Sequence, residues 1–289
     1  MSSQAGPATW PERSAAALHR EWTLASVVCL HAKKEVEAFC RKSPFLHLYS
    51  IGDLDDFFWP HTTWVALRQG TEVRQLALLY TDLTMRMPTV LAFAEQPESL
   101  MRDLLRAWLP VLPRRFYAHL TAGVADVLAD DYRMQVHGTF HKMGLTDRSR
   151  AAAIDGSEAV ALSAADTEDL LALYAASYPG NWFVPRMLET GFYFGIRRGR
   201  ALVSAAGVHV FSPQYKFAAL GSITTRPDAR GQGLATTATA RLCQELLQTG
   251  IEYVGLNVKA DNHSAIACYE KLGFERVTDY GEYTITNKT

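Results

Sequence analysis

The second half of the chain alternates apolar runs with a helical pattern. Apolar runs over Phe217–Thr225 and 253–258 predict two strands. Between them apolar side chains recur every four residues from Leu234 to Leu246, which predicts a helix ended by Gly250. The other elements expected in this half are strands over 159–162, 192–197, 201–210, 275–277 and 283–285, and helices over about 163–174 and 265–272.

The first half repeats this order of elements. The expected elements are helices over 36–41, 99–108 and 124–130, and strands over 45–51, 63–68, 73–83, 89–94, 115–120 and 140–145. The pattern predicts an α/β fold (an α+β mixed sheet) of two tandem domains, 1–150 and 151–289, each a mostly antiparallel twisted sheet flanked by helices. The small polar segment 146–157 marks the expected boundary, and residues 1–13 are expected to form a loose arm.

Composition excludes several classes of function. The 29 Lys and Arg residues and 30 Asp and Glu residues give a net charge of −1, so the chain has no general attraction for nucleic acid or acidic membranes. No apolar run reaches the roughly 18 residues that span a bilayer, and no signal peptide is evident, so we expect a cytoplasmic protein. The four cysteines lack CxxC spacing, which predicts buried thiols and neither a disulfide framework nor a metal site.

The connection between the predicted strand and helix is rich in glycine. Such a turn lets backbone N–H groups approach an anion closely, and the helix N-terminus adds partial positive charge. We therefore predict a phosphate site in which Arg230 holds the loop or pairs with a phosphate and Thr236 adds its hydroxyl. The backbone donors are expected from Gly231, Gln232, Gly233, Leu234, Ala235 and Thr236.

Downstream residues extend this pattern. Asn262 and Tyr269 follow the second strand, and the next helix ends at Gly273-Phe274. The order strand, R-x-x-G-x-G/A loop, helix, strand, N-x6-Y and G-F resembles the GNAT superfamily of acyl-CoA-dependent N-acyltransferases over residues 217–274, and more weakly back to about Glu158. The resemblance implies acetyl-CoA or a longer acyl-CoA as cosubstrate, no metal, and direct attack by an amine in a ternary complex.

The resemblance also implies roles for single residues. Backbone groups of Ile223 and Thr225 would pair with the pantetheine arm where two strands separate. Asn262 would bond the pantetheine, or else cap the next helix. Tyr269 would donate a proton to the departing sulfur, or else pack as a core aromatic residue.

The sequence leaves the general base open. The strand Phe217–Thr225 carries no titratable side chain over its first seven residues, where Ser222 is expected to bind substrate or orient a water. His209 on the preceding strand is the nearest candidate base, against an ordinary structural histidine. Glu168 and Glu189 are more distant candidates, and an amine that arrives neutral needs no base.

The aromatic loop after residue 177 is expected to shape the acceptor site. Tyr178 and Trp182 would supply walls and Asn181 a polar contact, although packing against the first half explains the same rings. The expected acceptor is a primary amine of a small molecule or an amino acid, and a homodimer stays open. The clusters 57–59 and 85–87 are expected in a core or an interface.

The first half departs from the GNAT pattern. Residues 1–150 contain no G-x-G, and the place of the phosphate loop reads Glu95-Gln96-Pro97-Glu98, whose carboxylates repel a pyrophosphate. This indicates a degenerate GNAT-like domain, with an unrelated α/β domain as the alternative. Two rival functions remain: a CoA-binding sensor or scaffold without turnover, and an aminoacyl-transfer enzyme that uses charged tRNA.

Overall fold

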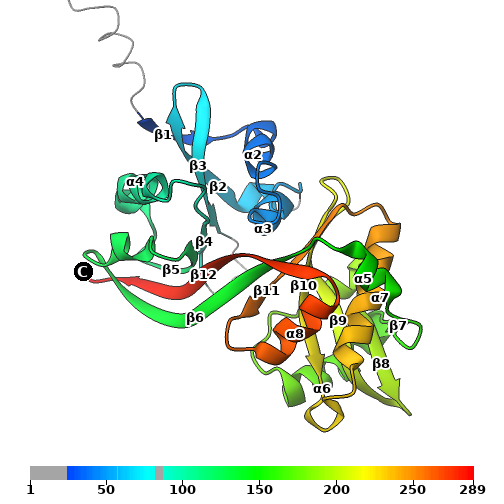
Figure 1. Ribbon diagram of the computed structural model, residues 1–289. Helices are drawn as coiled ribbons and strands as arrows, with labels where there is room; N and C mark the ends of the chain where they lie inside the picture. Colours follow the sequence, from blue (N-terminus) through cyan, green and yellow to red (C-terminus); the bar gives the residue numbers. More distant parts are fainter. Residues whose placement is uncertain (1–24, 57, 82–86) are drawn as a thin grey trace, which may run out of the picture.

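The computed structural model describes residues 25–56, 58–81 and 87–289 (Figure 1). The N-terminal arm, Phe57, Met85 and Arg86 lie outside the described residues. Within the described part of the chain, no helix is long and apolar enough to cross a membrane.

Twelve strands form one mixed sheet in the order β1-β2-β3-β4-β5-β12-β6-β11-β10-β9-β8-β7. The strands are β1 Ala25–Leu30, β2 Thr62–Gln69, β3 Glu72–Tyr80, β4 Thr89–Ala92, β5 Arg115–Thr121, β6 Tyr132–Leu145, β7 Val160–Ala161, β8 Phe194–Arg198, β9 Ala201–Ser212, β10 Phe217–Thr225, β11 Tyr253–Lys259 and β12 Phe274–Asn287. Among the described strands, β4–β5 and β10–β11 pair in parallel and the other pairs are antiparallel. The mixed, mostly antiparallel sheet confirms the predicted fold class.

Helices cover both halves of the sheet. They are α2 Lys33–Cys40, α3 Leu48–Gly52, α4 Ser99–Trp108, α5 Arg148–Ala153, α6 Thr167–Ser177, α7 Leu234–Gln248 and α8 His263–Lys271. Six 3-10 turns complete the described elements: η1 Trp59–His61, η2 Leu109–Val111, η3 Ala125–Leu128, η4 Ala164–Asp166, η5 Pro185–Thr190 and η6 Pro227–Ala229. The predicted helix α7 ends as expected, with Gly250 at a φ of 86° just beyond it.

Two long strands join the halves by exchange. β6 runs on from the first half to pair with β11, as in Phe140–Lys259 and Gly144–Gly255. β12 runs in the opposite sense, and its residues from Tyr280 to Thr286 pair with β5. Figure 1 shows both strands, green and red, passing between the halves, so that the C-terminus lies against the first half. A division at residue 150 stays a prediction, because each half completes the other's sheet.

Several sequence predictions differ from the structure, and among them the strand predicted over 140–145 begins earlier, as β6 at Tyr132. The strand expected over 45–51 is wrong, since the helix α3 lies there, and β1 was not predicted. The helix expected over 124–130 is only the 3-10 turn η3, and the two short strands expected after residue 274 are the single strand β12. Short apolar runs fit a buried helix or a strand equally well, and pairing with a distant strand decides the length of β12.

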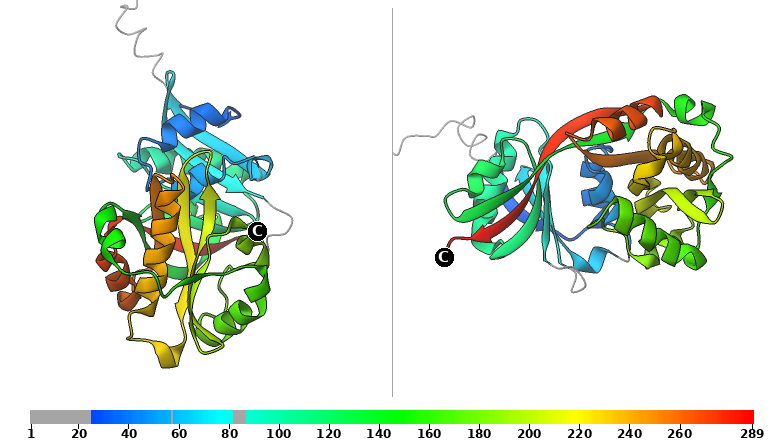
Figure 2. Two further views of the ribbon diagram at one scale, coloured as in Figure 1. Left: turned by 90° about the vertical axis from the view of Figure 1, so that its right-hand side faces the viewer. Right: turned by 90° about the horizontal axis from the view of Figure 1, so that it is seen from below.

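Helix α3 brings the two halves into contact. Gly52 lies against Val210 of β9, where an added Cβ would come within 2.2 Å of the valine side chain. Gly144 lies in the same way beneath the Phe45 ring. Figure 2 shows α2 and α3, in blue, between the first half and the strands of the second. A single cluster of buried side chains includes Leu48 and Ile51 with residues of β9 and β10. Helix α3 of the first half therefore covers this face of β9 and β10.

Candidate active site at the split between β10 and β11

The two parallel strands of the second half separate partway along their length. Pairing between β10 and β11 runs from Phe217–Tyr253 to Leu220–Leu256 and then stops. Beyond Leu220, Gly221 to Thr225 have no ladder partner on the β11 side. This part of β10 therefore has no strand partner on that side, and an extended ligand could add to its edge, as the resemblance implied for Ile223.

The open end of the split meets the glycine loop and the N-terminus of α7. Gly231 and Gly233 have φ angles of 76° and 77°, and no atom lies within 4 Å of a Cβ added to either. The first helical hydrogen bond runs from the Thr237 N–H to the Gly233 carbonyl, at 3.0 Å. The N–H groups of Leu234, Ala235 and Thr236 precede it and have no acceptor within the helix. The loop, exposed from Arg230 to Gly233, thus fits a pyrophosphate.

Three of the predicted cofactor residues are engaged within the protein. Thr236 Oγ1 lies 3.2 Å from Cys268 Sγ, so the hydroxyl faces α8 and only its backbone N–H remains for an anion. Asn262 caps α8, because its Oδ1 accepts from the Ala265 N–H at 3.3 Å. Arg230 Nε donates to the Thr225 carbonyl at 3.2 Å, which ties the loop to the end of β10. Their roles in binding a cofactor stay predictions.

The structure joins His209 and Ser222, which the sequence treated separately. Ser222 lies in a bulge: the ladder with β9 passes from Gly221–Gly207 to Thr224–Ala205 and skips two residues of β10. Its φ is 53°, its side chain is buried, and its Oγ lies 3.0 Å from His209 Nε2. Burial lowers the pKa of His209 to about 4. The imidazole is therefore neutral at pH 7 and a weak base, and Glu168 and Glu189 are exposed on α6 and η5.

Tyr269 is buried on α8 and its hydroxyl is unpaired. The residue is 7% exposed, and no hydrogen bond to it occurs among the described residues. Burial raises the pKa of the phenol, and Cys268, Tyr178 and Tyr49 add to the rise, so the hydroxyls of Tyr178 and Tyr49 lie within electrostatic range of Tyr269. The hydroxyl is not among the fully enclosed polar atoms that lack a partner, so it keeps contact with solvent. It is therefore open to a hydrogen bond with a ligand.

The aromatic loop packs on the first half, as one of the two interpretations had it. The ring centroids of Trp182 and Tyr117 lie 6.4 Å apart, which links the loop to β5. Asn181 is used inside the loop, since its Nδ2 donates to the Tyr178 carbonyl and its Oδ1 accepts from the Phe183 N–H, both at 2.8 Å. A contact between Asn181 and an acceptor stays a prediction, and it would require the side chain to give up one of these hydrogen bonds.

The far wall of the split comes from residues that the sequence analysis missed. Tyr49 on α3 and Lys142 on β6 both lie beside the aromatic cluster at the junction of the halves. Lys142 is 2% exposed, and burial lowers its pKa to about 7 while Glu282 opposes the shift. A lysine within the predicted strand 140–145, next to Met143 and one residue after His141, was the available signal. Its meaning depended on pairing with β11, which local sequence does not reveal.

The corresponding place in the first half is closed. Pairing of β4 with β5 ends at Ala92–Leu120, and the next gap is bridged by a hydrogen bond of 2.9 Å from the Ala94 N–H to Thr121 Oγ1. The Glu95 N–H donates to buried Gln75 at 3.0 Å, so this donor is not free for an anion. These contacts support the prediction of a degenerate first domain.

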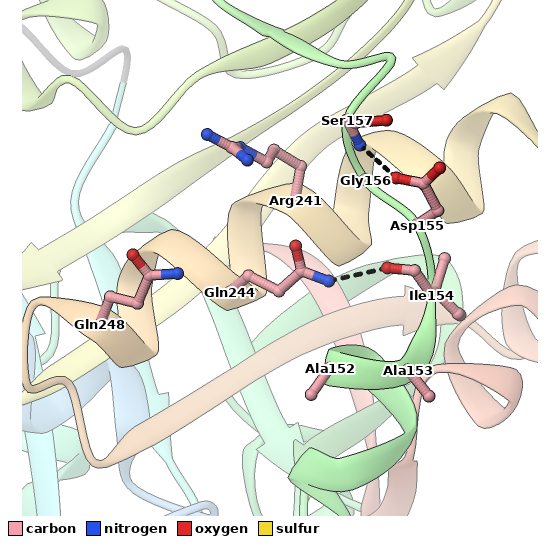
Figure 3. A pocket seen from close by; sticks show the side chains of 9 residues that line it. All are labelled: Ala152, Ala153, Ile154, Asp155, Gly156, Ser157, Arg241, Gln244 and Gln248. Atoms are coloured by element: carbon pink, nitrogen blue, oxygen red, sulfur yellow. Dashed lines mark hydrogen bonds between the residues drawn. The ribbon is translucent and has the colours of Figure 1, made fainter.

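A groove on the outer side of α7 serves a different purpose (Figure 3). Its lining residues are Ala152, Ala153, Ile154, Asp155, Gly156, Ser157, Arg241, Gln244 and Gln248. Gln244 Nε2 donates to the carbonyls of Ala151 and Ile154 at 2.9 and 2.8 Å. The expected boundary segment 146–157 is therefore held on α7 as an ordered connection, away from the glycine loop.

Metal ligands are not assembled in the described part of the chain, where no group of three or more His, Cys, Asp or Glu side chains is placed to hold an ion. The four cysteines are free thiols, and Cys29 is exposed, which corrects the expectation that all four are buried.

Comparisons with known proteins agree with this geometry. Residues 162–274 match the family model described as the acetyltransferase (GNAT) family. A mycothiol acetyltransferase from Saccharomonospora viridis is 47% identical over 57 residues, which are 20% of this chain and 19% of the relative. The [ribosomal protein bS18]-alanine N-acetyltransferase of Escherichia coli K12 is 41% identical over 61 residues, 21% of this chain and 41% of the relative. The chain thus spans less than half the length of these curated relatives.

A solved structure extends the likeness to the whole fold. A tandem GNAT protein from the clavulanic acid biosynthesis pathway superposes with a TM-score of 0.51 at 17% identity, covering 91% of this chain and 98% of that one. At this identity the likeness concerns the fold alone, and it covers both halves of the sheet. With the match over residues 162–274, it shows that the second half carries a domain of the GNAT family and that the whole chain has the tandem GNAT fold.

Proposed function

We propose that the protein is an N-acyltransferase that moves an acyl group, most simply acetyl, from acyl-CoA to a primary amine of a small molecule or amino acid. The observation that carries the proposal is the open split between β10 and β11, with the free N–H groups of α7 at its mouth and the unpaired Tyr269 hydroxyl beside it. Acyl-CoA supplies the activated acyl group.

The residues of the site divide the work by position. The amides from Gly231 to Thr236 would hold the pyrophosphate, and the backbone of Ile223, which has no ladder partner, would receive the pantetheine arm. Tyr269 would donate its phenolic proton to the departing sulfur, whose thiol has an ordinary pKa of about 8.5. Neutral His209, oriented by Ser222, would hold a water near the amine rather than act as a strong base.

Enclosure favours a small acceptor. The first half covers the site through α3, and Trp182 meets Tyr117 across the junction. Pockets at domain junctions typically surround a small ligand. A cytoplasmic setting and a reducing compartment remain part of this proposal.

Thiol release with a panel of amines tests the proposal, together with calorimetry of acetyl-CoA. We expect one acetyl-CoA per chain, because the second half has an open split and the first half has a bridged one. Two sites per chain would contradict the degenerate first domain. Binding without thiol release in the presence of any amine would instead support a CoA-binding sensor.

A further inference from the structure

Lys142 is a buried lysine whose ammonium group has no hydrogen bond or ion pair in the described part of the chain, and its Nζ is not among the fully enclosed polar atoms that lack a partner, so it keeps contact with solvent. The residue is 2% exposed, and its recorded neighbours are aromatic rings. Its Nζ lies 3.9 Å from the ring centroid of Phe93, 5.0 Å from that of Tyr49 and 5.5 Å from that of Tyr280. Ring faces stabilise a cation but do not satisfy its three N–H donors. A lysine buried along its stem, whose ammonium donors are free and still reach solvent, is available to a ligand.

The register of the sheet places this amine at the closed end of the split. Lys142 lies opposite Asn257 in the β6–β11 ladder, and Asn257 directly follows Leu256, the last residue of β11 that pairs with β10. The phosphate loop lies at the other, open end. A pantetheine arm that enters from the loop therefore ends near Asn257, so the Lys142 ammonium lies beside the place where the acyl group would react.

The neighbouring carboxylate does not neutralise Lys142 by contact. Glu282 accepts hydrogen bonds from the hydroxyls of Tyr117 and Tyr280, and His119 Nε2 lies 3.7 Å from it. No ion pair joins Glu282 to Lys142 among the described residues. Burial also lowers the pKa of His119 to about 4, so this histidine is neutral at pH 7. With a pKa lowered to about 7 by burial, the Lys142 amine is partly charged at pH 7, and an anion bound beside it, near the Tyr49 hydroxyl, would favour the ammonium form.

We propose that Lys142 is the acceptor-specificity residue and that its ammonium binds an oxyanion carried by the amine acceptor. The acceptor class is then a short amino acid or a related amine with a carboxylate or phosphonate a few bonds from the nucleophilic nitrogen. This inference rests on the proposed acyl transfer. The anion compensates the buried charge, and this fixes the amine beside the acyl group, which a neutral amine does not achieve.

The test compares anionic amines with neutral counterparts in the wild type and three variants. Alanine is paired with alaninamide, β-alanine with its amide, and 1-aminoethylphosphonate distinguishes a phosphonate from a carboxylate. Lys142→Met keeps the apolar stem among the rings, and Lys142→Arg keeps the charge. Lys42→Met is the matched control, because Lys42 also lies over a ring, that of Phe39 at 5.6 Å, but is half exposed on the surface.

We expect the wild type to prefer the anionic amines. Lys142→Met should lower that preference by about 10–100-fold, mainly through KM, since a charge-assisted bond is lost. Lys142→Arg should restore part of it, and Lys42→Met should leave it unchanged. An equal loss for anionic and neutral amines would assign Lys142 to proton transfer or folding and overturn the proposal. So would a wild type that prefers the neutral amines.

Direct binding separates this inference from the proposed function. Titration of alanine and alaninamide into the CoA-bound protein, followed by NMR, requires no turnover. If acetyl-CoA binds but no amine is acetylated, the proposed function fails, and selective binding of alanine that is lost in Lys142→Met still supports the anion site. Equal binding of alanine and alaninamide by the wild type overturns it. Thermal unfolding and acetyl-CoA affinity of each variant confirm that the fold is retained.

Discussion

Replacing Tyr269 by Phe should separate catalysis from stability. The ring is buried and its hydroxyl lacks a partner among the described residues, so the substitution removes no hydrogen bond of the fold. The hydroxyl keeps contact with solvent, since it is not among the fully enclosed atoms that lack a partner. We therefore expect the free energy of unfolding to change by less than about 0.5 kcal/mol in Tyr269→Phe.

The same substitution should slow the reaction. If the hydroxyl donates to the departing sulfur, its contribution is larger in the transition state than in the ground state, so kcat falls while acetyl-CoA affinity is retained. A general acid typically raises the rate by on the order of 10²–10⁴-fold. Because a thiolate is already a fair leaving group, we expect kcat to fall by about 10²-fold, which corresponds to about 2.7 kcal/mol in the activation free energy. Assays of thiol release, under conditions where the chemical step limits turnover, would measure this fall in kcat.

A paired tyrosine provides the control. Tyr193 is fully buried, and its hydroxyl donates to the Val208 carbonyl at 3.1 Å. Tyr193→Phe should lower the free energy of unfolding by about 1 kcal/mol, since a buried acceptor loses its donor. An unchanged kcat in Tyr269→Phe, or a loss of stability like that of Tyr193→Phe, would refute the reasoning and leave Tyr269 as a packing residue.

Three further changes test other parts of the structure. Gly233→Val should weaken acetyl-CoA binding, measured by calorimetry, at least 10-fold. At a φ of 77° a side chain strains the backbone by about 1–2 kcal/mol, and relief of the strain would move the N–H groups of the loop. Gly199→Val, at a φ of 59° on a distant hairpin, is the control and should strain the backbone without weakening acetyl-CoA binding. Deleting residues 1–150 removes β6, which lies between β12 and β11, and so exposes the edges of both strands. The remaining fragment should aggregate, as measured by size-exclusion chromatography, and a soluble, fully active fragment would contradict this. Because burial lowers the pKa of His209 from 6.5 to about 4, the unfolded chain binds a proton between these pH values that the folded protein does not. The free energy of unfolding, measured by urea titration, should therefore fall by about 3 kcal/mol from pH 6.5 to pH 4. His209→Gln should remove this pH-dependent loss, and an identical pH profile in the variant would contradict the burial argument.

The segment around the glycine loop could be predicted closely because its signals are local. The strand β10 has the predicted bounds, and α7 begins at the predicted Leu234. Glycines at the loop and after α7 adopt positive φ angles, the property for which glycine is read in a sequence. Each of these features depends on residues a few positions apart, so one sequence suffices.

The wall of the acceptor site could not be predicted in the same way. Tyr49 lies in a short apolar run that fits a strand as well as a helix, and only packing of α3 on β9 and β10 decides between them. Lys142 gains its position from pairing with Asn257, more than a hundred residues away along the chain. Such pairings leave no periodic trace in either segment.

The exchange of β6 and β12 explains why a half without a phosphate loop is part of the site. β6 enters the second half between β11 and β12 and carries Lys142 to the closed end of the split. In return β12 brings Glu282 to β5, where Tyr117 of the first half binds it. Each half therefore places a charged side chain against the other half's strands. We infer that selection preserves the first domain for the residues it contributes to the acceptor site. Only in the second domain does selection also preserve a loop with free N–H groups for a phosphate.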